Sequence, residues 1–134
     1  MNGIITNAGQ YRIHRVRIVV ALVTVANFLK IPEHMEELMN SFRKPSKDLI
    51  TLMSTTHAAF EKIHPFSDGN GRVGRLLMLA QSLQAGYVPP IVLKEIKYAY
   101  YKYLELAQNN DNSMPLQIFV AESMITADEL LFNS

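Results

Sequence analysis

The sequence predicts a mainly helical domain with one small β-hairpin near its start, and three observations support this fold class. Apolar residues recur at three- and four-residue steps along most of the chain, as on the buried face of an amphipathic helix. Proline and glycine stand between these stretches, where helices commonly begin and end. Residues 15–25 are instead rich in β-branched side chains, which favours a short pair of strands. The length of 134 residues fits one compact domain over residues 1–134.

Five helices are expected after the hairpin, each bounded by residues that start or stop a helix. Pro32 suits the first turn of the first helix, and Ser46 suits the N-cap of the second. Pro65 ends the second helix, because the residue before a proline is pushed out of helical geometry. Gly86 is a natural residue to follow the third helix. The expected ranges are 32–43, 47–64, 71–85, 92–107 and 115–131.

The composition limits the classes of partner. Lysine and arginine number 13 and aspartate and glutamate 12, and the net charge of +1 argues against nucleic acid or an acidic membrane as the main partner. The chain has no cysteine, which excludes disulfides and thiolate metal sites. Residues 1–10 do not resemble a signal peptide, and the most apolar stretch, residues 16–29, is too short and too interrupted to span a bilayer. We therefore expect a cytoplasmic protein.

The residues with specific chemistry gather between the second and third helices, where residues 64–75 read His-Pro-Phe-Ser-Asp-Gly-Asn-Gly-Arg-Val-Gly-Arg. Gly69 and Gly71 allow positive φ angles and let a ligand approach the backbone closely. Free N–H groups at the start of a helix form an anion-binding nest. Arg72 and Arg75 are three residues apart, so both project from the first turns of the helix. Two guanidinium groups over such a nest suit a polyphosphate.

Two further side chains complete the set of groups needed for phosphoryl-type transfer. Asp68 offers a hard oxygen ligand for Mg²⁺, which typically takes one or two carboxylates together with substrate phosphates. An unperturbed histidine has a pKa of about 6.5, so His64 suits the role of a general base at neutral pH. Base, metal ligand, anion nest and cations therefore lie within one short segment, as positioning and charge stabilisation in phosphoryl transfer require.

A structural loop and a zinc site are the alternatives to this interpretation. A Gly-Asn-Gly turn is by itself usually only a loop, and an arginine at a helix start is usually solvated. His57, Glu61 and His64 are four and three residues apart, so a helix would place them on one face, where they could imitate a zinc site. This spacing matches no common catalytic zinc motif. We therefore expect His57 to be a buried support for the loop and Glu61 to be exposed.

The segment from His64 to Arg75 resembles the signature of the Fic family, HPFx(D/E)GNGRxxR, at every defined position. Residues 9–12 resemble the lead into the family's β-hairpin, called the flap, and residues 57–63 resemble the helix before the signature. The residues that stand where family members line the nucleoside pocket are Tyr100, Tyr101 and Gln108. The resemblance covers about residues 9–120 and implies a Fic-type helical domain with a hairpin flap.

The resemblance implies a protein adenylyltransferase that uses Mg²⁺ and ATP to attach AMP to a Ser, Thr or Tyr hydroxyl of a target protein. It makes His64 the general base and Asp68 the Mg²⁺ ligand, and it makes Phe66 an apolar anchor for the loop. The residues that it assigns to phosphate binding are Gly69, Asn70, Gly71, Arg72 and Arg75. The flap residues that would clamp a target peptide by strand addition are Val16, Arg17 and Ile18.

Other functions stay open at this level. The presence of both signature glycines favours AMP transfer, but the same fold could transfer another nucleotide or a phosphate group. Fic proteins usually carry helices before the flap, which this chain is expected to lack, so an inactive or partner-dependent interaction module is also possible. No Ser/Thr-x-x-x-Glu inhibitory motif followed by Gly or Asn is found, so an inhibitory element is expected to be absent, divergent in sequence, or on a separate partner chain.

Overall fold

The computed structural model describes residues 9–16, 25–44 and 48–132, and helices make up most of them. The α-helices are α1 (Ile31–Arg43), α2 (Leu49–Ile63), α3 (Asn70–Gln84), α4 (Lys97–Asn109) and α5 (Met114–Phe132). Two 3-10 turns, η1 (Phe28–Lys30) and η2 (Lys94–Ile96), lead into α1 and α4. The predicted mainly helical fold class is confirmed. Within these ranges, no helix has both the length and the apolar content needed to cross a membrane.

The expected β-hairpin falls mostly on residues 17–24, which lie outside the described residues. Two of the three flap residues, Arg17 and Ile18, belong to that range. The flanking residues 9–16, which include Val16, and residues 25–27 are described and contain no strand. The hairpin and its role therefore stay predictions.

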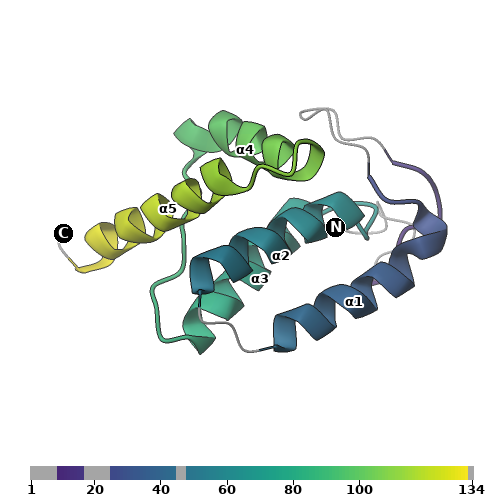
Figure 1. Ribbon diagram of the computed structural model, residues 1–134, viewed down its shortest axis with the longest axis horizontal. Coiled ribbons are helices and arrows are strands. Elements are labelled where there is room, and N and C mark those ends of the chain that lie inside the picture. Colours follow the sequence, from purple (N-terminus) through teal and green to yellow (C-terminus); the bar gives the residue numbers. More distant parts are fainter. Residues whose placement is uncertain (1–8, 17–24, 45–47, 133–134) are drawn as a thin grey trace.

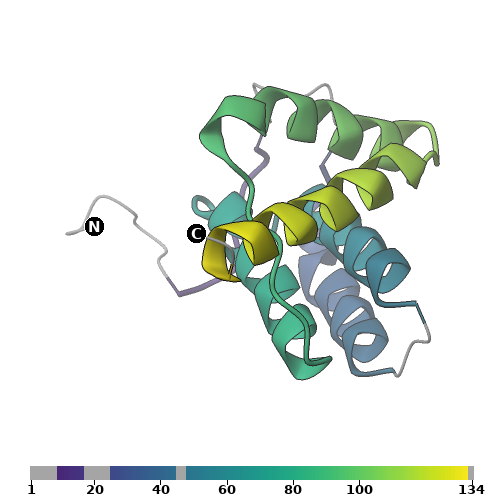
Figure 2. The ribbon, with the colours of Figure 1, turned by 90° about the vertical axis from the view of Figure 1, so that its left-hand side faces the viewer.

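Helix α2 is the centre of the fold and packs against each of the other four α-helices. Figure 1 shows α1 on one side of α2 and the α4–α5 pair on the other, and the turned view in Figure 2 keeps α4 and α5 together. One core cluster joins α2 to α3, α4 and α5 and contains Met53, Ala58, Met78, Tyr100, Leu104, Leu116, Phe119 and Val120. A second joins α1 to α2 and contains Ile31, Met35, Leu38, Phe60 and Ile63. Burial on both sides fixes α2, and with it the loop that follows.

The helix boundaries mostly agree with the predicted ones, with two corrections. Asp48, and not Ser46, caps α2, because the Asp48 side chain accepts the Thr51 N–H at 3.2 Å. Ser46 itself lies outside the described residues. The fourth helix begins at Lys97 instead of near residue 92, because residues 87–93 have no regular structure and η2 then leads into the helix. In that irregular segment the Ile91 N–H approaches the Ser123 carbonyl of α5 at 3.5 Å. Gly86 follows α3 with a φ of 82°, as expected.

Gly74 sets how closely α2 and α3 approach each other beside the loop. A Cβ atom at this position would lie 2.5 Å from Glu61 Oε1, 3.1 Å from His57 Cε1 and 3.2 Å from Phe60 Cδ1. All three atoms belong to α2, so any side chain larger than hydrogen would push the two helices apart. Gly74 is one of the variable positions of the signature, and the sequence alone gave no reason to single it out.

Candidate active site

His64 stands at the end of α2 in a left-handed backbone conformation, with a φ of 50° and a ψ of 60°. This conformation is uncommon for a residue with a side chain, and it turns the chain sharply out of the helix. The His64 N–H still donates to the Phe60 carbonyl at 2.9 Å. Pro65 follows and cannot donate a further helical hydrogen bond. The predicted end of the second helix at this proline is confirmed.

Arg12 holds this helix end from outside the helix. Its guanidinium donates to the carbonyl oxygens of His64 at 2.6 Å and of Ile63 at 3.2 Å. It also donates to the carbonyls of His14 at 3.0 Å and Ala26 at 2.5 Å. The residue is only 2% exposed. Arg12 belongs to the segment that resembles the lead into the flap, but no role could be predicted for it, since burial of an arginine cannot be seen from its neighbours in the chain.

Asn70, the first residue of α3, ties the loop into a closed turn. Its side-chain oxygen accepts the Phe66 N–H at 2.9 Å, and its amide nitrogen donates to the Phe66 carbonyl at 2.8 Å. Asn70 is 3% exposed, and Phe66 packs against the core cluster between α1 and α2. The Asn70 side chain is therefore occupied by the loop. Its backbone N–H is the group that remains for an anion.

The N-terminus of α3 forms a cradle that suits an anion. Its N-cap is Gly69, with a φ of 80°, and no side chain caps the helix there. The N–H groups of the first turn therefore keep their capacity to bind an anion at the positive end of the helix dipole. Both loop glycines make room for guanidinium groups, because a Cβ on Gly69 would lie 3.3 Å from Arg72 Nη2 and one on Gly71 would lie 3.2 Å from Arg75 Nη1.

One cavity of about 400 Å³ brings most of the predicted site residues together. Its lining consists of His64, Ser67, Asp68, Gly69, Asn70, Gly71, Arg72, Arg75, Lys97 and Tyr101. Three of these side chains are cationic and one is a carboxylate, so the lining carries a net positive charge that would attract a polyphosphate. The loop predicted from the sequence thus forms one wall of this cavity.

Asp68 stands exposed in this lining and has the chemistry of a magnesium ligand. Its Oδ1 accepts the Gly69 N–H at 2.8 Å, and its Oδ2 lies 4.0 Å from Arg72 Nη2. A carboxylate beside an anion cradle can share a cation with bound phosphates, which is how Mg²⁺ is usually held in nucleotide sites. The donor set therefore fits Mg²⁺ in the presence of a polyphosphate.

Lys97 is a lining residue that the sequence analysis missed. It opens α4, and its Nζ lies 5.9 Å from the ring centre of Tyr101, one helical turn further on. A cation over an aromatic face forms a favourable pair that could also stack against a nucleobase. The signal available in the sequence was the four-residue spacing from Lys97 to Tyr101, which places both on one face of a helix.

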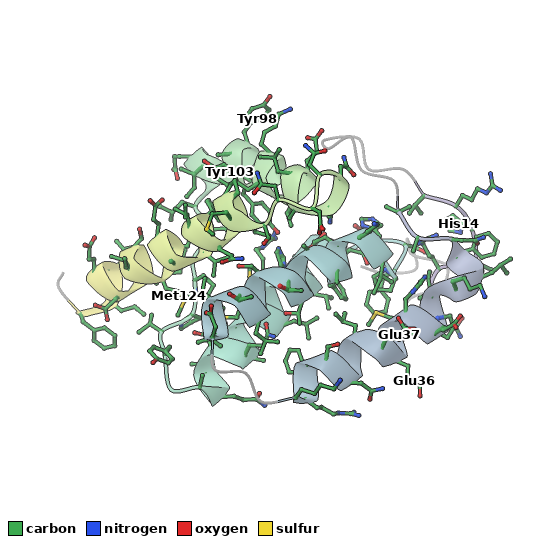
Figure 3. The ribbon with its side chains drawn as sticks, in the orientation of Figure 1. His14, Glu36, Glu37, Tyr98, Tyr103 and Met124 are labelled. Atoms are coloured by element: carbon green, nitrogen blue, oxygen red, sulfur yellow. The ribbon has the colours of Figure 1, made fainter. Side chains whose placement is uncertain are left out.

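Tyr100 and Gln108, both predicted for the nucleoside pocket, do not line this cavity. Tyr100 is 1% exposed and belongs to the core, because neighbouring residues on a helix point about 100° apart and only Tyr101 can face the loop. Gln108 lies two turns beyond Tyr101, or about 11 Å along the axis. Its amide donates to the Ala58 carbonyl of α2 at 2.9 Å. Figure 3 shows Tyr98, by contrast, on the outer face of α4.

A buried polar cluster lies behind the cavity, between α2, α3 and α4. Glu61 was expected to be exposed, and this was wrong: it is 8% exposed, and burial raises its pKa to about 7, partly offset by the charge of Arg75. His57 is buried as expected, its Nε2 is hydrogen-bonded to the Tyr100 hydroxyl, and burial lowers its pKa to about 4. Among the described residues, no three His, Asp or Glu side chains converge to hold a metal ion, so the zinc alternative finds no support in this geometry.

The imidazole of His64 is in the neutral form that a general base needs. Burial lowers its pKa, the positive charge of Arg12 lowers it further, and the nearby Glu61 carbonyl partly offsets both effects. The ring is therefore neutral at pH 7. Its Nδ1 is buried, and the Glu61 carbonyl lies near the ring. The other ring nitrogen, Nε2, is left to exchange a proton.

Comparison with known proteins identifies the family. The family model described as Fic/DOC family matches residues 1–82. The chain is 38% identical over 89 residues to "Protein adenylyltransferase Fic" of Aedes aegypti. The matched residues make up 66% of this chain and 18% of that protein. It is 40% identical over 87 residues to the protein of the same name from Nematostella vectensis, and this match covers 60% of this chain and 20% of that one. The chain thus spans about a fifth of the length of these curated relatives.

Solved structures agree on the fold. A Fic family protein from Desulfovibrio desulfuricans superposes with a TM-score of 0.80 at 24% identity, over 99% of this chain and 43% of that one. A Fic domain-containing signalling protein from Bacteroides thetaiotaomicron gives a TM-score of 0.71 at 22% identity, over 78% of this chain and 47% of that one. The family model covers more than half of the chain and the solved structures share its fold, so the chain belongs to the Fic/DOC family.

Proposed function

We propose that this chain is a protein adenylyltransferase, which transfers AMP from ATP to a hydroxyl group of a target protein. The observation that carries the proposal is the cavity at the start of α3, where an uncapped helix N-terminus and three cationic side chains share one lining with the His64 imidazole. An anion cradle beside a neutral base is the arrangement that nucleotidyl transfer needs. The names of the curated relatives support the same reaction.

In the proposed reaction, the hydroxyl oxygen of the target attacks the α-phosphorus of ATP. A new oxygen–phosphorus bond forms, the bond from the α-phosphorus to the oxygen bridging the β-phosphate breaks, and pyrophosphate leaves. The hydroxyl proton passes to Nε2 of His64, because Nδ1 is buried and would carry the proton of the neutral ring. Burial and the Arg12 charge lower the pKa of His64, so the ring is free to accept this proton at pH 7.

The other lining residues would bind and orient the nucleotide. The N–H groups of Asn70 and Gly71, with the guanidinium groups of Arg72 and Arg75, would hold the phosphates and stabilise the charge on the departing pyrophosphate. Tyr101, paired with Lys97, would pack against the nucleoside. The other residues predicted for the nucleoside, Tyr100 and Gln108, would act by holding α4 against α2.

The proposed cofactor is Mg²⁺, and Asp68 is the residue that would hold it, next to the bound phosphates. When bound, the ion would neutralise phosphate charge and make the α-phosphorus a better electrophile. The proposed partner is a protein with an exposed Ser, Thr or Tyr hydroxyl, presented along the flap at Val16, Arg17 and Ile18 by strand addition. A separate inhibitory partner is also part of the proposal.

Nucleotide binding and product mass together test the proposal. Calorimetry with Mg²⁺-ATP should show one binding site, and mass spectrometry of the chain and of a cell lysate should find AMP adducts on hydroxyl side chains. His64→Ala should keep ATP binding and lose the adducts, because the phosphates bind to α3 and not to the base. His34→Ala, a histidine of α1 outside the cavity lining, is the matched control and should behave as the wild type. Adducts of UMP, GMP or phosphate in place of AMP would reject adenylyl transfer and retain the fold, and absence of ATP binding would reject the proposal.

A further inference from the structure

Arg12 is a buried cation whose partners in the described structure are carbonyl oxygens and not carboxylates. Its guanidinium makes four hydrogen bonds, to the carbonyls of Ile63, His64, Ala26 and His14, at 2.5 to 3.2 Å. Burial lowers the pKa of the group, because desolvation disfavours the charged form. A buried charge without a counter-ion destabilises a fold, so its position calls for an explanation beyond packing.

The location of these carbonyls gives part of that explanation. Two of them, at Ile63 and His64, belong to the last residues of α2, where a helix leaves its carbonyl groups unpaired and carries partial negative charge. A guanidinium is a good partner for such a helix end, because its rigid fork can serve several acceptors at once. The remaining two, at Ala26 and His14, tie the segments before α1 to the same point. Figure 3 shows His14 at the end of the domain where α1 begins.

The hydrogen bonds of Arg12 converge on the backbone around His64. Besides the side-chain bond to the His64 carbonyl at 2.6 Å, the Arg12 backbone N–H donates to the Pro65 carbonyl at 2.8 Å. One residue therefore holds the carbonyls of the two consecutive peptide bonds that follow His64. Since His64 has a φ of 50°, a conformation that is unfavourable for a residue with a Cβ, something outside the helix must hold it there.

We propose that Arg12 is a positioning residue of the transferase site, which fixes the backbone of His64 and places a fixed positive charge beside its imidazole. The inference rests on the proposed function, in which His64 is the base. A positive charge at this point disfavours the imidazolium form and keeps the ring ready to accept a proton. Among the charged groups described around the cavity, which include Asp68, Arg72, Arg75 and Lys97, the charge that lowers the pKa of His64 is that of Arg12.

Two substitutions of Arg12 separate the effect of its guanidinium hydrogen bonds from the effect of its charge. Arg12→Lys keeps a cation but cannot serve four carbonyls, so kcat should fall by roughly 10- to 100-fold, as for a misplaced catalytic group, with the KM for ATP unchanged. The pKa of His64, measured by NMR titration of the imidazole, should stay low in this variant. Arg12→Gln removes the charge as well, so the pKa of His64 should rise towards its ordinary value and the acid limb of the pH–rate profile should move to higher pH. Arg43→Gln, at the exposed end of α1, is the matched control and should change neither quantity.

The outcomes distinguish this inference from the proposed function. If Arg12→Gln folds and shows the wild-type kcat and an unchanged His64 titration, the positioning role is wrong. If Arg12→Gln does not fold, Arg12→Lys decides: wild-type kcat and a wild-type pH profile in that variant would overturn the inference. If the wild type transfers no AMP, the proposed function fails, and the NMR titration of His64 in the wild type and the two Arg12 variants still tests the effect of the charge.

Discussion

Replacement of Glu61 by Gln should change how the stability of the domain depends on pH. The Glu61 carboxyl is buried, its Oε1 has no hydrogen-bond partner in the described part of the chain, and its pKa is raised from 4.5 to about 7. Between these two pH values the folded state holds a proton that the unfolded state has released, so stability falls as the pH rises through this window. One pKa unit corresponds to about 1.4 kcal/mol, so the loss is up to about 3 kcal/mol.

His57 acts in the opposite direction and hides this effect in the wild type. Burial lowers its pKa from 6.5 to about 4, so between these values the unfolded state holds the extra proton and stability rises with pH. The two contributions are of similar size, and they nearly cancel from about pH 4.5 to 6.5. Glu61→Gln removes one of them, because an amide resembles the protonated carboxyl and does not titrate.

Urea unfolding followed by circular dichroism at fixed pH values from 4 to 8 measures the effect. The difference in unfolding free energy, Glu61→Gln minus wild type, should become more positive by up to about 3 kcal/mol as the pH rises from 4 to 8. Glu36→Gln, which removes an exposed carboxylate on α1 (Figure 3), is the matched control and should leave the difference flat. A flat difference for Glu61→Gln as well would show that Glu61 is not desolvated, and the buried cluster behind the cavity would be wrong.

Three further predictions follow from the site. Gly74→Ala should lower the unfolding free energy by about 1–3 kcal/mol through overpacking. Glu61→Ala in the same chain should relieve part of this loss, and a double-mutant cycle by urea unfolding would measure the relief. Additive losses would contradict the close approach of α2 and α3. Asn70→Ala should cost about 1–3 kcal/mol because the polar groups of Phe66 lose their partners, and a thermal midpoint equal to that of the wild type would contradict the clamp. Chelation of Mg²⁺ should stop transfer and added Mg²⁺ should restore it, whereas Asp68→Ala should abolish this response, and Mg²⁺-stimulated transfer by that variant would remove Asp68 from the metal site.

The parts of the molecule that the sequence predicted well depend on local chemistry. The helical class follows from apolar periodicity, and the end of α2 follows from Pro65, because both are properties of neighbouring residues. The loop at residues 64–75 could be picked out for a similar reason, since its glycines and cations lie in one short segment. The structure places eight of these twelve residues in the lining of one cavity.

The parts that the sequence missed depend on contacts between segments far apart in the chain. Arg12 acts on residues about fifty positions away, and nothing near it in the sequence reveals that its charge is buried. Glu61 looks like a solvated charge on a helix, yet the approach of α3 at Gly74 covers it. Tyr100 and Tyr101 are adjacent, and only the packing of α4 decides which of them enters the core. Such choices are made by tertiary packing, which local patterns do not contain.

Transfer of radioactivity from two forms of ATP is the measurement that tests adenylyl transfer most directly. The chain is incubated with Mg²⁺ and ATP labelled on either the α- or the γ-phosphate, and labelled protein is counted for the wild type and for His64→Ala. We expect label from the α-phosphate only, with loss of that label in His64→Ala, because the bond broken lies between the α- and β-phosphates and the proton goes to His64. Label from the γ-phosphate, or full α-labelling by His64→Ala, would contradict it.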